Sequence, residues 1–313
     1  MKKIFGRSIF SLSVIVLLFA GYHLLESSAL PESDVKTEEP ARMMFHAVDI
    51  PEKLTFMEEE VPLSYNDVRE SLDRELLVNS YFHSQTLRFL KLAPRFMSII
   101  VPILEADTVP TDFAYLALAE SGFDQRAVSP AGAVGFWQFM KGTATDYGLE
   151  VNNEIDERYH VEKATQAACK YLKESYERYG SWTLVAASYN AGRSFIDRQL
   201  ERQKVSSYYD LLVGEETSRY VFRILALKLI MENPTEYGFV VKEDEKYPLW
   251  NVKTITVNGP VKDFADFATE RGTNYKILKM LNPWLRETFL TNSKGKTYAI
   301  KIPAKGFRTK AND

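Results

Sequence analysis

From residue 67 to about residue 232 the sequence keeps a helical spacing of apolar residues and shows no strand-like alternation. The segments YNDVRESLDRELLVNSYF and SQTLRFLKLAPRFMSIIVPILEAD place apolar residues three and four positions apart, which is typical of amphipathic helices. Glycines at Gly122, Gly180 and Gly192 mark the ends of three later helical segments. A continuous run of helices with no sheet predicts a mainly α fold, with one compact helical domain over residues 67–235.

The pattern changes after residue 235. The segments NVKTITVNG and KTYAIKIP alternate as strands do, whereas VKDFADFATERG and NYKILKMLNPW between them have helical spacing. This order predicts a second, small domain of β-α-α-β type over residues 250–305.

The N-terminus has the pattern of an export signal. Lys2, Lys3 and Arg7 precede an apolar run over residues 9–25, close to the shortest length that crosses a bilayer. Residues 1–25 are therefore predicted to be a signal peptide or an N-terminal membrane anchor. Either reading directs the remainder of the chain out of the cytoplasm, because the basic residues stay inside.

Residues 26–66 are rich in Glu, Pro, Ser and Lys and are predicted to form a linker, ordered in part toward its end. The acidic run Glu58–Glu60 within it is expected to be solvated.

Composition excludes several classes of function. The formal net charge of -3 does not favour a nucleic-acid partner. The single cysteine, Cys169, can form no disulfide within the chain. The four histidines lie far apart, and neither the G-x-S-x-G nor the H-E-x-x-H motif occurs. We therefore expect no bound metal and no cofactor.

The segment FAYLALAESGF carries a carboxylate where a helix end disfavours one. Glu120 follows an apolar run and precedes Gly122 and Phe123. Apolar surroundings and the negative end of a helix both raise the pKa of a carboxyl group. A carboxyl that is protonated near neutrality can act as a general acid on a glycosidic oxygen. The alternative interpretation is a surface glutamate where the chain leaves the helix.

The next segment, AVSPAGAVGFWQFMKGTATDYGL, combines small residues with polar and aromatic ones. Gly132 and Gly135 are expected to let backbone and ligand approach closely. Trp137 fits either the core or a surface on which a sugar stacks. Gln138 offers an amide to a polar substrate, and Ser129 offers a hydroxyl to a sugar or to Glu120.

Four motifs in order then resemble those of soluble-lytic-transglycosylase-type domains. AESGFDQRAVSPAGAVGFWQFM, LVAASYNAG and EETSRYV are similar to the family's E-S, G-x-x-G-x-W-Q-F-M, A-x-Y-N-A-G and E-T-x-x-Y-V patterns. The W-Q form and the C-terminal domain resemble the D-type membrane-bound lytic murein transglycosylases. The resemblance implies a lysozyme-like, all-helical catalytic domain.

The C-terminal domain resembles a LysM module, which binds chains of N-acetylglucosamine. NGPVKD stands where that family has Gly-Asp after the first strand, so a structural or partner-binding role stays open.

The resemblance also implies roles for individual residues. Glu120 is the single catalytic acid and base, Ser129 lies near the reacting sugar, and Glu216 supports the site. The Tyr189 hydroxyl lies near the catalytic carboxyl. The substrate-binding positions that it implies, together with Trp137, are Ser129, Gln138, Met140, Tyr189, Asn190 and Glu216.

The implied activity is non-hydrolytic cleavage of the β-1,4 bond between N-acetylmuramic acid and N-acetylglucosamine, which leaves 1,6-anhydro ends. The implied partner is the peptidoglycan strand, and the implied location is the periplasm, with possible anchoring by residues 1–25. A lysozyme-like hydrolase is one alternative, and it requires a second carboxylate such as Asp124 or Asp146. The other is a non-catalytic protein that binds the cell wall.

Overall fold

The computed structural model describes residues 46–308. The signal peptide or anchor predicted over residues 1–25, and residues 26–45 of the predicted linker, lie outside the described residues. Within residues 46–308, no helix combines the length and the hydropathy required to cross a bilayer.

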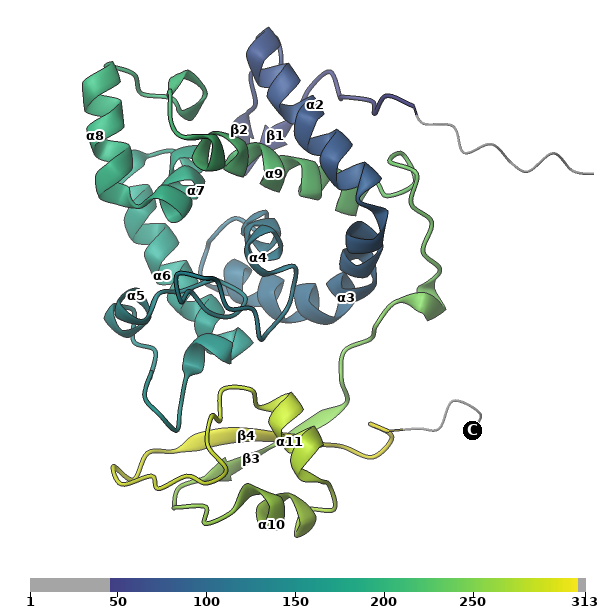
Figure 1. Cartoon of the computed structure of the whole chain (residues 1–313), viewed down its shortest axis with the longest axis vertical. Helices are drawn as coiled ribbons and strands as arrows, with labels where there is room; N and C mark the ends of the chain where they lie inside the picture. Colours follow the sequence, from purple (N-terminus) through teal and green to yellow (C-terminus); the bar gives the residue numbers. More distant parts are fainter. Residues whose placement is uncertain (1–45, 309–313) are drawn as a thin grey trace, which may run out of the picture. The chain divides into compact units, whose positions relative to one another are not determined.

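The predicted mainly α architecture is confirmed (Figure 1). In Figure 1, α4 is seen nearly end-on, with the longer helices of the domain around it. The helices of this domain are α2 (Asn66–Tyr81), α3 (His83–Ala106), α4 (Phe113–Ser121), α5 (Lys141–Asp146), α6 (Val161–Tyr179), α7 (Trp182–Ala191), α8 (Arg193–Gln203) and α9 (Glu215–Glu232).

Helix α4 forms the centre of the domain because nearly all of its side chains are apolar. Phe113, Leu116 and Leu118 are fully buried. The helix ends at Gly122 as predicted, with this glycine in the left-handed conformation at φ 58°. A Cβ atom there would lie 2.8 Å from the ring of Phe89, so both the backbone conformation and the packing require glycine.

A short hairpin from the predicted linker packs on this domain. Strands β1 (Thr55–Phe56) and β2 (Glu59–Glu60) pair antiparallel, and Phe56 is fully buried. The Glu59 carboxylate accepts hydrogen bonds from the Ser181 hydroxyl and from Thr183 N, both at 3.0 Å, at the start of α7. The interpretation of this acidic run as solvated is therefore wrong for Glu59, which caps the N-terminus of a helix.

The second domain has the predicted β-α-α-β order. Its elements are β3 (Val252–Val257), α10 (Phe264–Thr269), α11 (Tyr275–Leu281) and β4 (Tyr298–Pro303). The two strands pair antiparallel with Ile255 opposite Ile300. Phe264, Leu278 and Ile300 are fully buried between the strands and the helices, which gives this small domain its own core.

The loop after α5 contacts this core directly. Ile155 is buried in one cluster with residues of the second domain and forms a β-bridge with Leu285. Backbone hydrogen bonds join Asp156 N to Trp284 O at 2.9 Å and Arg286 N to Glu154 O at 2.7 Å. These contacts connect the two domains through backbone as well as side chains.

Candidate active site

Glu120 lies in the last turn of α4 and is partly buried. The hydroxyl of Tyr220, on α9, donates a hydrogen bond to Glu120 Oε1. The pKa of Glu120 is raised to about 7, and burial is the largest cause. The Glu216 charge also raises this pKa, whereas the Tyr220 hydrogen bond and the Arg223 charge lower it. The pKa is thus shifted upward, as the sequence predicts, and the largest cause is desolvation, as expected at the end of an apolar helix.

Tyr220 was not among the predicted site residues. It lies in the EETSRYV segment, four residues after Glu216, so both face the same side of α9. Tyr220 is 2% exposed, and its buried hydroxyl has Glu120 as its hydrogen-bond partner. The spacing of four residues between Glu216 and Tyr220 in this helical motif is the sequence signal by which Tyr220 could have been found.

Tyr189 lies on α7 beside the same carboxyl. Burial raises the pKa of Tyr189 well above its ordinary value, and the charge of Glu120 raises it further. Its hydroxyl, however, donates to the carbonyl oxygen of Trp137 at 2.6 Å, and its ring centroid lies 5.2 Å from that of Tyr171. The tyrosine therefore neighbours Glu120 electrostatically, but its hydroxyl holds the loop that carries Trp137.

A groove of about 260 Å³ lies between this loop and α7. Tyr189 and Asn190 contribute to it from α7, and Asn190 Oδ1 also accepts a hydrogen bond from the Thr217 hydroxyl at 3.0 Å. Met140 is 46% exposed at its edge. The structure thus brings four predicted substrate-binding residues to one groove: Gln138, Met140, Tyr189 and Asn190.

Ser129 and Gln138 are engaged within their own loop. Ser129 Oγ accepts a hydrogen bond from Ala133 N at 3.0 Å. Gln138 Nε2 donates to Gly135 O at 2.8 Å and to Ala127 O at 3.3 Å. Neither side chain hydrogen-bonds Glu120 within residues 46–308; Gln138 lines the groove, and Ser129 does not.

Gly135 permits a close approach, but of backbone to backbone. A Cβ atom at this position would lie 2.1 Å from the carbonyl oxygen of Arg158. Arg158 also donates to Phe139 O at 3.2 Å and forms an ion pair with Asp156 at 2.7 Å. The expectation that Gly135 admits a ligand is therefore wrong, because Arg158 occupies the space.

Trp137 is a core residue. It is fully buried, and its indole N–H donates to the Thr165 hydroxyl at 2.9 Å. The assignment of Trp137 as a substrate-binding residue is therefore wrong, since no face of the ring is available to a sugar.

The other candidate carboxylates, Glu216, Asp124 and Asp146, are more exposed than Glu120. Glu216 has 66% of its side chain exposed and pairs with Arg223 at 3.2 Å, so it acts on Glu120 through its charge and makes no hydrogen bond to it. Asp124 is exposed and accepts a hydrogen bond from Arg126 N, and Asp146 is exposed at the end of α5. Glu120 is therefore the carboxyl in this region that can be protonated near neutral pH and still be reached.

Two family models match the chain. Residues 99–212 match the transglycosylase SLT domain, and residues 253–306 match the soluble lytic transglycosylase C-terminal LysM-like domain. The first match contains Glu120 and the residues of the groove, and it ends before Glu216 and Tyr220.

Two curated proteins are similar to parts of the chain. The chain is 30% identical over 244 residues to membrane-bound lytic murein transglycosylase D of Escherichia coli K12, covering 76% of this chain and 52% of the relative. It is 27% identical over 113 residues to a putative tributyltin chloride resistance protein of Alteromonas sp. strain M-1, covering 36% of this chain and 55% of the relative. The chain thus spans about half the length of the curated relatives it matches.

Two crystal structures of larger lytic transglycosylases also align with the chain. An inactive mutant of Slt from Pseudomonas aeruginosa gives a TM-score of 0.38 at 20% identity, over 49% of this chain and 26% of that one. The 70 kDa soluble lytic transglycosylase of Escherichia coli gives 0.38 at 21% identity, over the same shares. The two family matches thus follow one another along the chain, the transglycosylase SLT domain first and the soluble lytic transglycosylase C-terminal LysM-like domain second.

Proposed function

We propose that this protein is a peptidoglycan lytic transglycosylase of the cell envelope. It cleaves the β-1,4 bond between N-acetylmuramic acid and N-acetylglucosamine and leaves a 1,6-anhydro end. The observation that carries the proposal is the place of Glu120, partly buried at the end of an apolar helix and hydrogen-bonded by Tyr220, within residues that match the transglycosylase SLT domain. Burial there raises the pKa of Glu120 to about 7.

A single carboxyl with this pKa performs both proton transfers. Protonated Glu120 donates its proton to the glycosidic oxygen, and the leaving sugar departs with it. The resulting carboxylate accepts the proton of the muramoyl 6-hydroxyl as that oxygen closes on C1. No water is consumed, so the second carboxylate of an inverting hydrolase is not required.

The neighbouring residues support this cycle. The Tyr220 hydroxyl stabilises the carboxylate that forms after the first transfer, because its hydrogen bond favours the ionised group. Tyr189 and Asn190 line the groove that receives the glycan, together with Gln138 and Met140. Glu216 acts through its charge, which favours the protonated form of Glu120.

This activity gives each predicted domain a role. Residues 67–235 form the catalytic domain, residues 250–305 form a LysM-like domain that binds the glycan strand, and residues 26–66 connect the catalytic domain to the N-terminus. Residues 1–25 direct export to the periplasm or anchor the protein to the inner membrane.

The test is digestion of purified peptidoglycan sacculi, with mass analysis of the products. A lytic transglycosylase releases muropeptides that are lighter by one water than the products of a hydrolase. Reducing ends in place of anhydro ends would make the protein a muramidase. Intact sacculi, under conditions where a known muramidase digests them, would support the non-catalytic alternative.

A further inference from the structure

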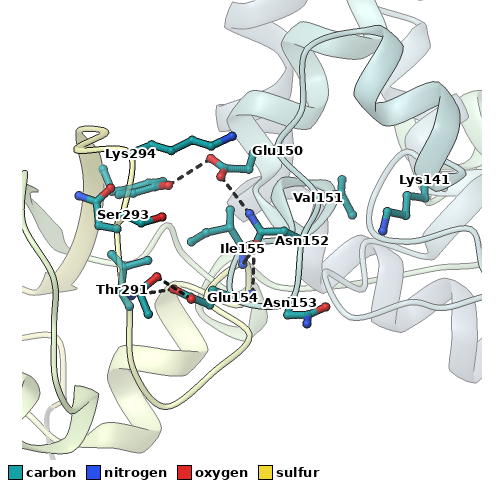
Figure 2. Close-up of a pocket in the computed structure, with 13 residues that line it drawn as sticks. Lys141, Glu150, Val151, Asn152, Asn153, Glu154, Ile155, Thr291, Ser293 and Lys294 are labelled. Carbon is teal, nitrogen blue, oxygen red and sulfur yellow. Dashed lines mark hydrogen bonds between the residues drawn. The ribbon is translucent and has the colours of Figure 1, made fainter.

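A second pocket, of about 460 Å³, lies between the loop after α5 and the loop before β4 (Figure 2). Figure 2 shows the side chains of residues 150–155 facing those of residues 291–294 across it. Its lining is polar on both sides, with Asn152 and Asn153 from the helical domain and Thr291 and Ser293 from the LysM-like domain.

This pocket adjoins the candidate active-site groove. Met140 lines the groove, and the next residue, Lys141, lines the pocket. Both residues are exposed. The groove and the pocket are thus lined by consecutive residues of the chain.

The acidic residues of the pocket are already neutralised or hydrogen-bonded. Glu154 accepts from Thr291 N at 2.7 Å and from the Thr291 hydroxyl at 2.8 Å. Glu150 accepts from Lys296 Nζ at 2.9 Å and from the Tyr298 hydroxyl at 3.1 Å. These contacts attach the LysM-like domain to the helical domain; Glu150 is paired with a cation, whereas Glu154 meets neutral donors and keeps its charge.

The basic residues of the pocket have no such partners. Lys141 and Lys294 both line it, and within residues 46–308 neither forms an ion pair or a side-chain hydrogen bond. Two ammonium groups therefore remain in a polar pocket whose own acids are already hydrogen-bonded. A ligand that supplies carboxylates satisfies both, and amide or hydroxyl groups satisfy the asparagine and serine side chains.

From these contacts we infer that the pocket binds the acidic peptide carried by a peptidoglycan strand whose glycan lies in the groove. The inference rests on the proposed function for the identity of the polymer. The unpartnered lysines favour the peptide over the sugar, because the lactyl carboxyl of a peptide-bearing strand is in amide linkage and the free carboxylates lie on the peptide.

The experiment measures binding of soluble strand fragments to the full chain carrying Glu120→Gln, so that the fragments stay intact. Three fragments are compared: one with free peptide carboxylates, one with these carboxylates amidated, and a peptide-free oligomer of N-acetylglucosamine, which carries no lactyl carboxylate. We expect the free-acid fragment to bind about tenfold more tightly than the amidated one, as two partly screened ion pairs allow.

Two double variants then locate the effect. Lys141→Gln with Lys294→Gln should abolish the preference for the free-acid fragment and leave binding of the peptide-free glycan unchanged. The matched control, Lys170→Gln with Lys276→Gln, removes two exposed lysines outside the pocket, one from each domain, and should retain the preference. Thermal unfolding of both variants shows that they are folded.

The outcomes separate the inference from the proposed function. Equal affinity for free-acid and amidated fragments, or an equal loss of the preference in both double variants, overturns the inference while the groove still binds glycan. Failure of all three fragments to bind contradicts the proposed substrate itself.

Discussion

Two glutamates within the helical domain both contact helix α9, and their surroundings are opposite. Glu75, on α2, is 1% exposed and lies 2.6 Å from Arg219 Nε and 3.9 Å from Arg223 Nε. Glu120, on α4, is partly exposed, and its hydrogen-bond partner is the neutral hydroxyl of Tyr220. One helix therefore supplies guanidinium groups to the first carboxyl and a phenol to the second.

The difference distinguishes a carboxylate that stabilises the fold from a carboxyl that can take part in catalysis. A buried carboxylate between arginines is an ion pair that joins α2 to α9, and removal of one partner leaves an uncompensated charge. Desolvation raises the pKa of Glu120 to about 7 although the Tyr220 hydrogen bond lowers it, so Glu120 can exchange a proton in the physiological range. Burial alone does not identify a catalytic acid, whereas partial burial with a neutral hydrogen-bond partner marks Glu120 as the candidate.

The largest expected effect is on turnover. Glu120→Gln should lower the rate of peptidoglycan cleavage about 10³-fold, because the amide can neither donate nor accept the transferred proton. The control is Glu215→Gln, which removes an exposed carboxylate from the first turn of α9 and should change the rate less than about twofold. Release of soluble muropeptides measures both, and a Glu120→Gln rate within about tenfold of the wild type would contradict the assignment.

The second prediction removes the donor partner of each glutamate in turn. Arg219→Met should lower the free energy of unfolding by about 3 kcal/mol, because it leaves Glu75 buried with one distant arginine. Tyr220→Phe should lower it by only about 1 kcal/mol, the value of one hydrogen bond. Urea unfolding at neutral pH compares them, and equal losses would remove the distinction between the two sites.

The third prediction concerns stability and pH. The pKa of Glu120 is about 7 in the folded protein and 4.5 in its ordinary environment, so the folded state holds this proton more tightly than the unfolded state. The wild type should therefore lose stability as the pH rises from about 4.5 to 7, by about 2 kcal/mol for a group that is partly exposed.

Glu120→Gln has no such proton to lose. The variant should match the wild type near pH 4 and exceed it in stability at pH 8, as measured by urea unfolding at both values. A variant less stable than the wild type at pH 8 would show that Glu120 is not kept neutral by its surroundings.

The smallest effect is expected from Tyr220→Phe on the pH profile. The Tyr220 hydrogen bond lowers the pKa of Glu120, so its loss raises that pKa further. The rate should fall by about tenfold. The basic limb of the rate profile should move to higher pH, because the protonated form persists longer. A basic limb that stays in place or moves down would contradict the role given to this hydroxyl.

Local patterns predicted most of the fold. Apolar spacing indicated the long helices and the β-α-α-β domain, and Gly122 marked the end of α4, because each depends on residues close together in the chain. The helices α5 and α8 were not predicted, since each buries a single side chain, Ala144 or Ile196, and so has no apolar stripe. Glu59 was misinterpreted because its partners at residues 181–183 lie more than 120 residues away.

The candidate site was predicted in part for the same reason. The position of Glu120 in an apolar helix indicated a raised pKa, which requires only local burial. The choice of Tyr220 over Tyr189 as the hydroxyl on this carboxyl depends on how α9 and α7 pack against α4. The burial of Trp137 likewise depends on Thr165 of α6, which the loop sequence does not contain.

The most direct test of the central claim is a titration of the Glu120 carboxyl itself. Protein with isotope-labelled glutamate is followed by NMR across the pH range, and Glu120→Gln identifies the signal by its disappearance. A midpoint near pH 7 is the predicted result. A midpoint near 4.5, the ordinary value of a glutamate, would show a carboxyl that is ionised at neutral pH and cannot serve as the general acid.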